Sequence, residues 1–308
     1  MNSLVVPAQD IKSAAISVGF HACGVAAVHR LDSLVRRYSP WLSRHGHADM
    51  QYMEQHIDKR MDPAQLLPGA KSVVSVLLGY KPTQVMKGSP RIAQYAYGPD
   101  YHERVKSMLF QLIALVKDNY PDFEAKPCVD TVPISDKLWA HAAGLGWIGR
   151  NTLLVNPNLG SYCYIGELVT TAIMDKYDNP MPSRCGSCRL CVDCCPNNAL
   201  VSCPESSSDD DSPTELLASR CSSYNTVENR SETLPPSLRL AGYAFGCDCC
   251  QLCCPFNQNA RSLLEVDDER IRQLELLSSA DEASFRRATR HSAINRIKFP
   301  QWQRNLNH

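Results

Sequence analysis

Apolar residues alternate between helical and strand-like spacing over the first 178 positions of the chain. Five apolar side chains between residues 102 and 119 follow the period of an amphipathic helix: Val105, Leu109, Leu112, Ile113 and Val116. Further helices are predicted at residues 8–19, 50–67 and 135–143. Short apolar or β-branched runs predict strands at Cys23–Val28, Ser72–Leu78, Lys126–Val129, Thr152–Asn156 and Tyr162–Thr170. This alternation predicts one α+β or α/β-type domain over residues 1–178.

The pattern changes after residue 178, where cysteines dominate. Ten of the fifteen cysteines lie in two runs, Cys185–Pro196 and Cys247–Pro255. The first run reads C-x2-C-x2-C-x3-C-P, the bacterial ferredoxin spacing, in which three thiolates bind one [4Fe-4S] cluster and the fourth binds a second. The second run fits the same template when aligned on its proline, except that Ala244 occupies one ligand position. Cys221, upstream, can supply the missing thiolate, so we predict a smaller, ferredoxin-like unit at residues 179–262.

The template predicts two sets of four ligands. One set is Cys185, Cys188, Cys191 and Cys254, and the other is Cys195, Cys221, Cys247 and Cys250. Three cysteines fall outside the spacing and are predicted not to bind iron: Cys194, Cys249 and Cys253. Two zinc ribbons are the alternative, but zinc requires neither a third cysteine at the same spacing nor Cys-Pro in both runs. Disulfides are less favoured, because no secretion signal accompanies the cysteines.

Composition limits the possible partners. The chain has 308 residues, of which 44% are hydrophobic and 21% charged, and its formal net charge is zero. No global field therefore draws it to nucleic acid or membrane, and any such binding would be local. The N-terminus lacks a basic segment followed by an apolar one, and no run approaches the roughly 18 apolar residues of a membrane span. We expect a protein of the reducing cytoplasm.

Residues 263–308 form a basic tail. No acidic residue follows Glu282, whereas six positive charges do: Arg286, Arg287, Arg290, Arg296, Lys298 and Arg304. Aromatic side chains are interleaved with them: Phe285, Phe299 and Trp302. Such a mixture suits phosphate contact and base stacking, but it equally suits a C-terminal helix with a solvated basic face.

The segment Gly144–Gly149 matches G-x-G-x-x-G without the context of a dinucleotide site. Such a site requires the glycines to follow a strand and open a helix, whereas here they follow the predicted helix 135–143 and lead into a strand. We therefore predict a tight helix-to-strand turn, with Trp147 folded onto the core.

Asp130 ends a predicted strand, a position from which a carboxylate can project into a cleft as an acid or base. The alternative is that Asp130 or Ser135 merely caps the following helix. Asp136, in the first turn of that helix, suits the helix dipole.

Taken together, these motifs resemble the epoxyqueuosine reductase family. The resemblance covers nearly the whole chain and rests on residues 58–60, 66–71, 98–102, 129–168, 185–201, 220–228 and 245–257. It implies an N-terminal domain that binds cobalamin beside two [4Fe-4S] clusters. It also implies reduction of the epoxide of epoxyqueuosine at the tRNA wobble position, the last step of queuosine synthesis.

The resemblance implies roles for individual residues. Asp130 would be the proton donor, with a pKa raised by burial beside the corrin ring. Cobalamin, with its lower base detached and no histidine on cobalt, would contact Arg60, Asp130, Leu154, Ile165, Ser223, Glu228, Cys247 and Asp248. The tail would contact tRNA through Arg286, Arg287 and Arg290.

Two departures from the family are visible. Many relatives carry a longer C-terminal extension, so we expect tRNA binding here to rest on the remaining basic surface. Cys249 and Cys253 stand where relatives usually have other residues. We expect a monomer, away from membranes, that takes electrons from an external donor. The alternatives are a dehalogenase-like corrinoid reductase of a small molecule, which has no use for a basic tail, and an electron-transfer ferredoxin, which would bind no corrinoid.

Overall fold

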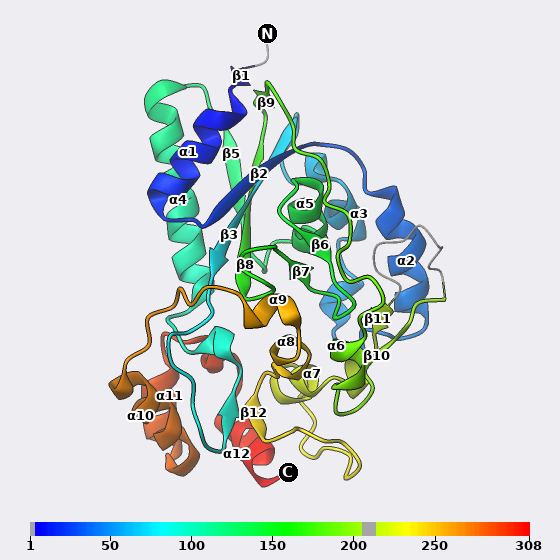
Figure 1. Ribbon diagram of the computed structural model, residues 1–308, viewed down its shortest axis with the longest axis vertical. Helices are drawn as coiled ribbons and strands as arrows, with labels where there is room; N and C mark the ends of the chain where they lie inside the picture. Colours follow the sequence, from blue (N-terminus) through cyan, green and yellow to red (C-terminus); the bar gives the residue numbers. More distant parts are fainter. Residues whose placement is uncertain (1–3, 205–213) are drawn as a thin grey trace.

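The computed structural model of the protein describes residues 4–204 and 214–308. A four-stranded sheet forms the centre of its upper half (Figure 1), and every pairing within the sheet is antiparallel. In spatial order, its strands are β2 (Ala22–Ala27), β3 (Ser72–Gly79), β8 (Cys163–Thr170) and β5 (Ala125–Cys128). The N-terminal part is therefore α+β, one of the two classes that the sequence predicts.

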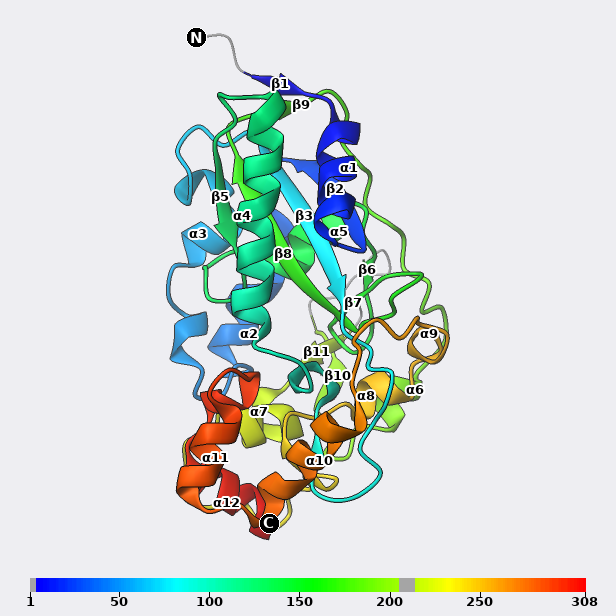
Figure 2. The ribbon, with the colours of Figure 1, turned by 90° about the vertical axis from the view of Figure 1, so that its left-hand side faces the viewer.

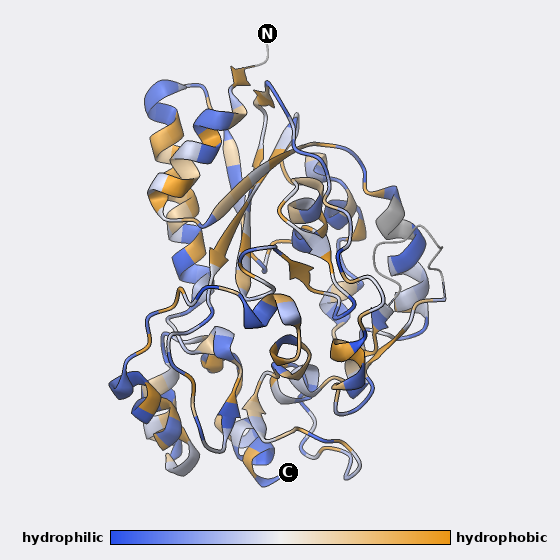
Figure 3. Cartoon of the chain, viewed as in Figure 1, coloured by the Kyte–Doolittle hydropathy of each residue, from blue (hydrophilic) through white to orange (hydrophobic). Residues whose placement is uncertain are grey.

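Helices cover both faces of this sheet. Helices α1 (Ala8–Val18) and α4 (Tyr101–Asn119) pack on one face, and α5 (Asp136–Ala142) packs on the other (Figures 1 and 2). All eight residues of β3 are buried, because alternate side chains enter the two cores. In Figure 3 the central strands are mainly orange, whereas α4 alternates between orange and blue, as an amphipathic helix does.

Most predicted elements of this half are confirmed, and one helix is wrong. The predicted helix 102–119 is α4, and four of its five predicted apolar side chains are buried. The predicted helix 50–67 is instead three short pieces: η1 (Gln51–Met53), α3 (Ile57–Met61) and η2 (Pro63–Gln65). His56 has a left-handed φ of 56° and Asp62 is extended before Pro63, so neither junction can continue a helix. The sequence pattern did not predict these elements: β1 (Val5–Val6), which pairs with β9 (Ile173–Met174), and α2 (Asp32–Ser43).

The glycine-rich segment forms the predicted turn. It follows α5 and leads into β6 (Trp147–Ile148), which pairs with β7 (Leu154–Val155), a shorter strand than predicted. Gly146 is required there, because a Cβ atom would lie 2.3 Å from the Val155 carbonyl oxygen. Trp147 is fully buried, and its Nε1 donates a hydrogen bond to Cys185 Sγ at 3.4 Å. The turn therefore contacts the first cysteine run.

The cysteine-rich segment occupies the lower half of Figure 1. Its elements are short: α6 (Leu190–Asp193), β10 (Leu200–Ser202), β11 (Thr214–Leu216), η4 (Ala218–Arg220), α7 (Ser222–Val227), β12 (Tyr243–Phe245), α8 (Cys249–Leu252) and α9 (Pro255–Gln258). Strand β12 pairs in parallel with β4 (Arg91–Ile92), which comes from the N-terminal half of the chain. η3 (Gln94–Ala96) follows β4. The loop 80–100 is thus part of both halves.

The tail folds into a compact helical layer beneath this segment (Figure 2). Its elements are α10 (Asp268–Leu276), η5 (Leu277–Ser279), α11 (Glu282–Thr289), η6 (Ala293–Arg296) and α12 (Phe299–Asn307). Phe285 and Trp302 are buried and pack with Phe299; the ring centroids of Trp302 and Phe299 lie 5.3 and 5.6 Å from that of Phe285. The suggestion that these rings stack on bases is wrong, because they form the core of the tail. Over residues 4–204 and 214–308, no helix is both long and apolar enough to cross a bilayer.

Candidate functional site

A cavity of about 540 Å³ lies between the lower end of the sheet and the cysteine-rich segment. Most of the residues predicted to contact cobalamin line it: Asp130, Leu154, Ile165, Ser223, Cys247 and Asp248. Arg60 lies beside it and donates a hydrogen bond to the backbone oxygen of Tyr52, a lining residue, at 3.0 Å. Glu228, also outside the lining, forms an ion pair with Arg296 at 2.6 Å. The fold therefore gathers residues from four distant segments around one space.

Asp130 follows β5 with a left-handed φ of 38°, a conformation that is unfavourable for non-glycine residues and that recurs at functional sites. Its carboxylate accepts hydrogen bonds from His102 Nε2 at 2.9 Å and from the Tyr101 hydroxyl at 3.1 Å. The side chain is 52% exposed, as expected for a group that faces an open cavity. Its predicted placement in a cleft is confirmed.

The protonation of this carboxylate differs from expectation. The hydrogen bond from His102 holds the pKa of Asp130 below its usual 3.8, and it outweighs burial, which acts in the opposite direction. The expected rise of the pKa is thus wrong for this arrangement, because local sequence does not reveal the histidine contact. Asp130 is an anion here, and the nearest proton lies on its neighbour.

His102 lies between two carboxylates. Its Nδ1 contacts Asp100 Oδ1 at 2.7 Å, and its Nε2 contacts Asp130. Burial alone lowers the pKa of His102, but the hydrogen bonds to Asp130 and Asp100 outweigh burial and raise the pKa above 6.5. Both ring nitrogens of His102 thus contact carboxylates beside the cavity, and these contacts favour the protonated form, which can return a proton to Asp130.

Tyrosine rings form a second feature that the sequence pattern did not predict. Five of them line the cavity: Tyr52, Tyr80, Tyr95, Tyr101 and Tyr164. The Tyr101 and Tyr164 rings are stacked, with centroids 4.6 Å apart and planes 3° apart. Tyr80 also packs against Tyr164, with ring centroids 4.6 Å apart. This wall offers broad aromatic surface to a large flat ligand.

The opposite wall is the loop of the second cysteine run. Asp248 is 1% exposed, and its carboxyl accepts hydrogen bonds from the Gln94 amide at 2.8 Å and from Gln251 Nε2 at 3.2 Å. Burial raises the pKa of Asp248 to about 7. These bonds fix the loop that carries Cys247 to the loop after β4.

The thiols of the first predicted ligand set lie near one another. Burial, then the nearby thiols of Cys185, Cys254 and Cys188, raise the pKa of Cys191 to about 11. Cys254 comes from the second run, so the fold joins residues more than 60 positions apart, as the ferredoxin template requires.

The second predicted set also converges. Burial is the largest cause that raises the pKa of Cys250 well above its usual value, and Cys221 and Cys195 are among the neighbouring thiols that add to it. Cys195 Sγ accepts a hydrogen bond from the Ala199 amide at 3.2 Å, and amide donors of this kind stabilise thiolate ligands. Cys247 and Cys221 both line the cavity, so this set lies nearer to it than the first.

The cations of the tail divide into two groups. Arg296 is held by Glu228, and Arg304 donates to the backbone oxygens of Asn225, Asn229 and Ser231, so both have structural partners. The three arginines predicted to contact tRNA are exposed on and beside α11: Arg286, Arg287 and Arg290. Arg286 also pairs with Glu282 at 2.6 Å.

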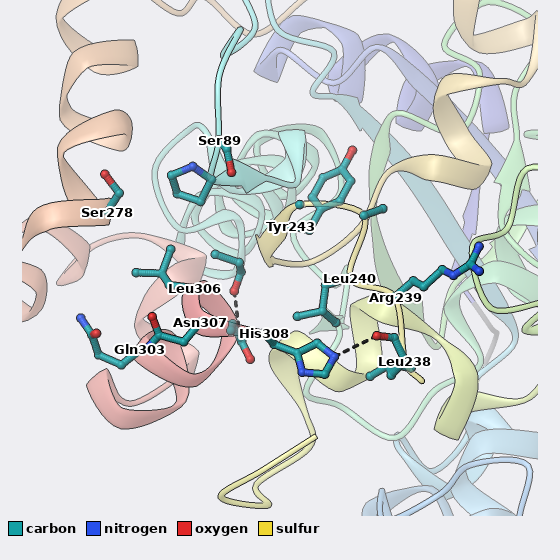
Figure 4. A pocket seen from close by; sticks show the side chains of 15 residues that line it. Ser89, Leu238, Arg239, Leu240, Tyr243, Ser278, Gln303, Leu306, Asn307 and His308 are labelled. Atoms are coloured by element: carbon teal, nitrogen blue, oxygen red, sulfur yellow. Dashed lines mark hydrogen bonds between the residues drawn. The ribbon is translucent and has the colours of Figure 1, made fainter. Parts of the chain in front are cut away.

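A second hollow, of about 680 Å³, lies at the far end of the molecule between residues 238–244 and α12 (Figure 4). His308 Nε2 contacts the Leu238 carbonyl oxygen there at 2.8 Å. The described residues that line it include none of those predicted for cofactor or metal binding. The smaller cavity, which combines titratable groups with the cysteine loops, is therefore the candidate site.

Comparison with known proteins supports the choice of this cavity as the candidate site. Residues 60–131 match a family model described as "Epoxyqueuosine reductase QueG, DUF1730", and residues 184–257 match one described as "4Fe-4S double cluster binding domain". The chain thus carries a domain that binds two [4Fe-4S] clusters, and zinc ribbons are excluded.

Curated relatives and solved structures extend the similarity to the whole chain. An epoxyqueuosine reductase of Leadbetterella byssophila is 36% identical, covering 97% of this chain and 96% of the relative, and one of Gloeobacter violaceus is 37% identical, covering 97% and 94%. The structure of the Streptococcus thermophilus epoxyqueuosine reductase superposes with a TM-score of 0.84 at 26% identity, covering 97% of this chain and 79% of that one. A crystal structure of epoxyqueuosine reductase with an epoxyqueuosine-modified tRNA-Tyr stem loop superposes with a TM-score of 0.80 at 28% identity. The match covers 96% of this chain and 79% of that one. This chain belongs to the epoxyqueuosine reductase family.

Proposed function

We propose that the protein reduces the epoxide of epoxyqueuosine in tRNA to the alkene of queuosine. The reaction takes up two electrons and two protons and releases water. The observation that carries the proposal is the hydrogen-bonded series Asp100–His102–Asp130, which ends in a cavity whose opposite wall is a cluster-ligand loop. Protons and electrons can thus reach the same space from opposite sides.

The cavity fits the corrinoid that the family resemblance implies. Its aromatic wall suits a large macrocycle, and aliphatic Leu154 and Ile165 extend that surface. Beside it, the buried Nε of Arg60 has no hydrogen-bond partner among the described residues and is free to donate to a polar substituent. Bound there by these residues and by the Cys247–Asp248 loop, cobalamin would supply the low-potential electrons that open an epoxide.

Side chains of the protein itself donate and relay the protons. Asp130 holds a position from which it can donate to the departing epoxide oxygen, and the Tyr101 hydroxyl fixes the orientation of its carboxylate. His102 passes its proton to Asp130 along their shared hydrogen bond, and Asp100 stabilises the imidazolium that supplies it. The pair therefore acts as one acid, although the hydrogen bond from His102 lowers the pKa of the Asp130 carboxyl itself.

Each part of the chain has a role in this proposal. Residues 1–178 bind corrinoid and substrate, residues 179–262 deliver electrons through the two [4Fe-4S] clusters, and residues 263–308 contact tRNA. The clusters pass on electrons from an external donor protein. Because the proposed substrate is tRNA, the enzyme is placed in the cytoplasm. It is also proposed to act as a monomer.

The replacement Asp130→Asn tests the proposal. The amide keeps the size of the side chain but cannot donate the proton, so conversion of epoxyqueuosine-tRNA falls by about 10²- to 10⁴-fold. Iron, sulfide and cobalamin content stay at parent values. Turnover is measured anaerobically with added cobalamin and a strong reductant, by chromatography of nucleosides from the digested tRNA.

The matched control is Asp118→Asn, an exposed carboxylate at the end of α4, which leaves turnover unchanged. If Asp130→Asn works near the parent rate, Asp130 is not the proton donor. If the loaded parent protein forms no queuosine, the proposed reaction itself is wrong.

A further inference from the structure

Two cysteines without a predicted ligand role face each other across the two cysteine runs. We propose that Cys194 and Cys253 are a modification site at which a reversible disulfide joins the runs. The pairing concerns neither the cavity nor the predicted ligands, and it goes beyond the reductase reaction.

The two residues occupy equivalent positions. Cys194 follows α6 with φ −84° and ψ −3°, and Cys253 follows α8 with φ −84° and ψ −7°. Each thiol donates to the carbonyl oxygen three residues earlier, Cys191 and Cys250 respectively, and both contacts measure 3.7 Å. Since the surrounding runs repeat the same C-C-P sequence, the repeat places two matching thiols opposite each other.

The thiols are in direct contact. Helices α6 and α8 pack together (Figure 1), and the Cys253 thiol is hydrogen-bonded to the Cys194 sulfur. Cys194 Sγ also lies 3.2 Å from the Cys249 carbonyl oxygen, which orients it toward the second run. Formation of the disulfide would bring these two sulfur atoms to a separation of ~2.05 Å.

Accessibility favours reaction at this pair. Cys194 is the one exposed cysteine in the described part of the chain, and Cys253 is half-buried beside it. Cys194 lies between Cys191 and Cys195, which belong to different predicted ligand sets, and Cys253 lies between Cys250 and Cys254 in the same way. A disulfide here would therefore tie both ligand loops together without taking a ligand from either set.

A low-molecular-weight disulfide such as oxidised glutathione is a sufficient oxidant. The Cys194 thiolate attacks one of its sulfur atoms, forming a mixed disulfide and releasing one glutathione thiolate. The Cys253 thiolate then attacks Cys194 Sγ, and the second glutathione leaves. Two protein thiols lose two electrons, glutathione disulfide gains them, and the two glutathione thiolates take up the two protons.

The test uses the intact protein with its clusters under anaerobic conditions. After incubation with oxidised glutathione and proteolysis without reductant, mass spectrometry should find the Cys194 peptide joined to the Cys253 peptide. Dithiothreitol should reverse the link, and the visible absorbance of the clusters should remain unchanged throughout.

Three variants identify which cysteines form the link. Cys194→Ser and Cys253→Ser each lose the link, whereas Cys249→Ser, the matched control from the same run, keeps it. The proposal is overturned if the parent gains only separate glutathione adducts, if Cys249 replaces Cys253 as the partner, or if cluster absorbance falls in step with the link. The last result would mean that the reacting thiols are ligands.

Discussion

Glu167 is a fully buried carboxyl in the middle of β8, and neither of its oxygens has a hydrogen-bond partner among the described residues. Burial, and then the charges of Asp136 and Asp130, raise its pKa well above 4.5. The folded protein keeps this proton at pH values at which the unfolded chain releases it. Its contribution to stability therefore decreases as pH rises from about 4.5 through the folded-state pKa.

The variant Glu167→Gln should remove that decrease. Its thermal unfolding midpoint, relative to the parent, should rise between pH 5 and pH 8, because the amide cannot ionise. Differential scanning calorimetry at both pH values measures the effect. Parallel pH profiles of parent and variant would show that the buried carboxyl does not titrate differently in the two states.

At the scale of residues, the sequence predicts what local spacing determines. The predicted ligand cysteines follow a short template, and the structure places thiols of the two runs near one another. Asp130 is recognisable from its place at a strand end. His102 is not, because its partner Asp130 is 28 positions away, and no periodic pattern predicts a contact between the start of a helix and the turn after a strand. The only sign is the pair Asp100 and His102, an acid two positions before a histidine at a helix start.

Trp302, on α12, lies at the centre of the tail's apolar core. Trp302 is fully buried against Phe285, and its Nε1 donates to the Leu277 carbonyl oxygen at 3.0 Å. Trp302→Ala should lower the free energy of unfolding by about 3–5 kcal/mol, since it leaves a cavity and removes the hydrogen bond to the Leu277 carbonyl oxygen. The fall in thermal midpoint measures this loss.

Leu276→Ala is the control for that substitution. Leu276 belongs to the same helical layer but is 65% exposed, so its truncation should change the midpoint little. Equal shifts for the two variants would contradict the view that Trp302 stabilises the core of the tail.

At the scale of elements, long and regular patterns of apolar residues predict helices and strands reliably. The run that forms β3 and the helical spacing that forms α4 each extend over enough positions for burial to determine them. The predicted helix 50–67 fails because the dihedral angles at His56 and Asp62 interrupt it. Pro63 is a local signal for the second interruption, whereas no regular pattern predicts the left-handed conformation of His56. The role of the tail's aromatic residues is hard to predict for a similar reason: spacing alone does not show which face of a helix is covered.

At the scale of the whole molecule, a chain without net charge must bind RNA through a local surface. The triple variant Arg286→Gln, Arg287→Gln and Arg290→Gln should weaken binding of epoxyqueuosine-tRNA. The slope of log affinity against log salt should also become shallower, by about 0.7–0.9 for each phosphate that the protein no longer neutralises. Filter binding at several salt concentrations measures both quantities.

Arg272→Gln is the matched control. Arg272 is an exposed arginine on neighbouring α10, where it pairs with Glu269 at 2.8 Å. Its replacement should leave the slope unchanged. If the triple variant and this control behave alike, tRNA does not bind at α11.

The pairing of β4 with β12 has a consequence for how the protein is made. Strand β4 is synthesised about 150 residues before β12, and three carbonyl oxygens between residues 257 and 260 hold the Lys81 ammonium. The Asp100 amide likewise donates to the His291 carbonyl oxygen. A ribosome must therefore release almost the entire chain before the loop 80–100 finds its partners. The lining of the cavity extends from Tyr52 to Gln251, so the cavity too is complete only after most of the chain has been synthesised.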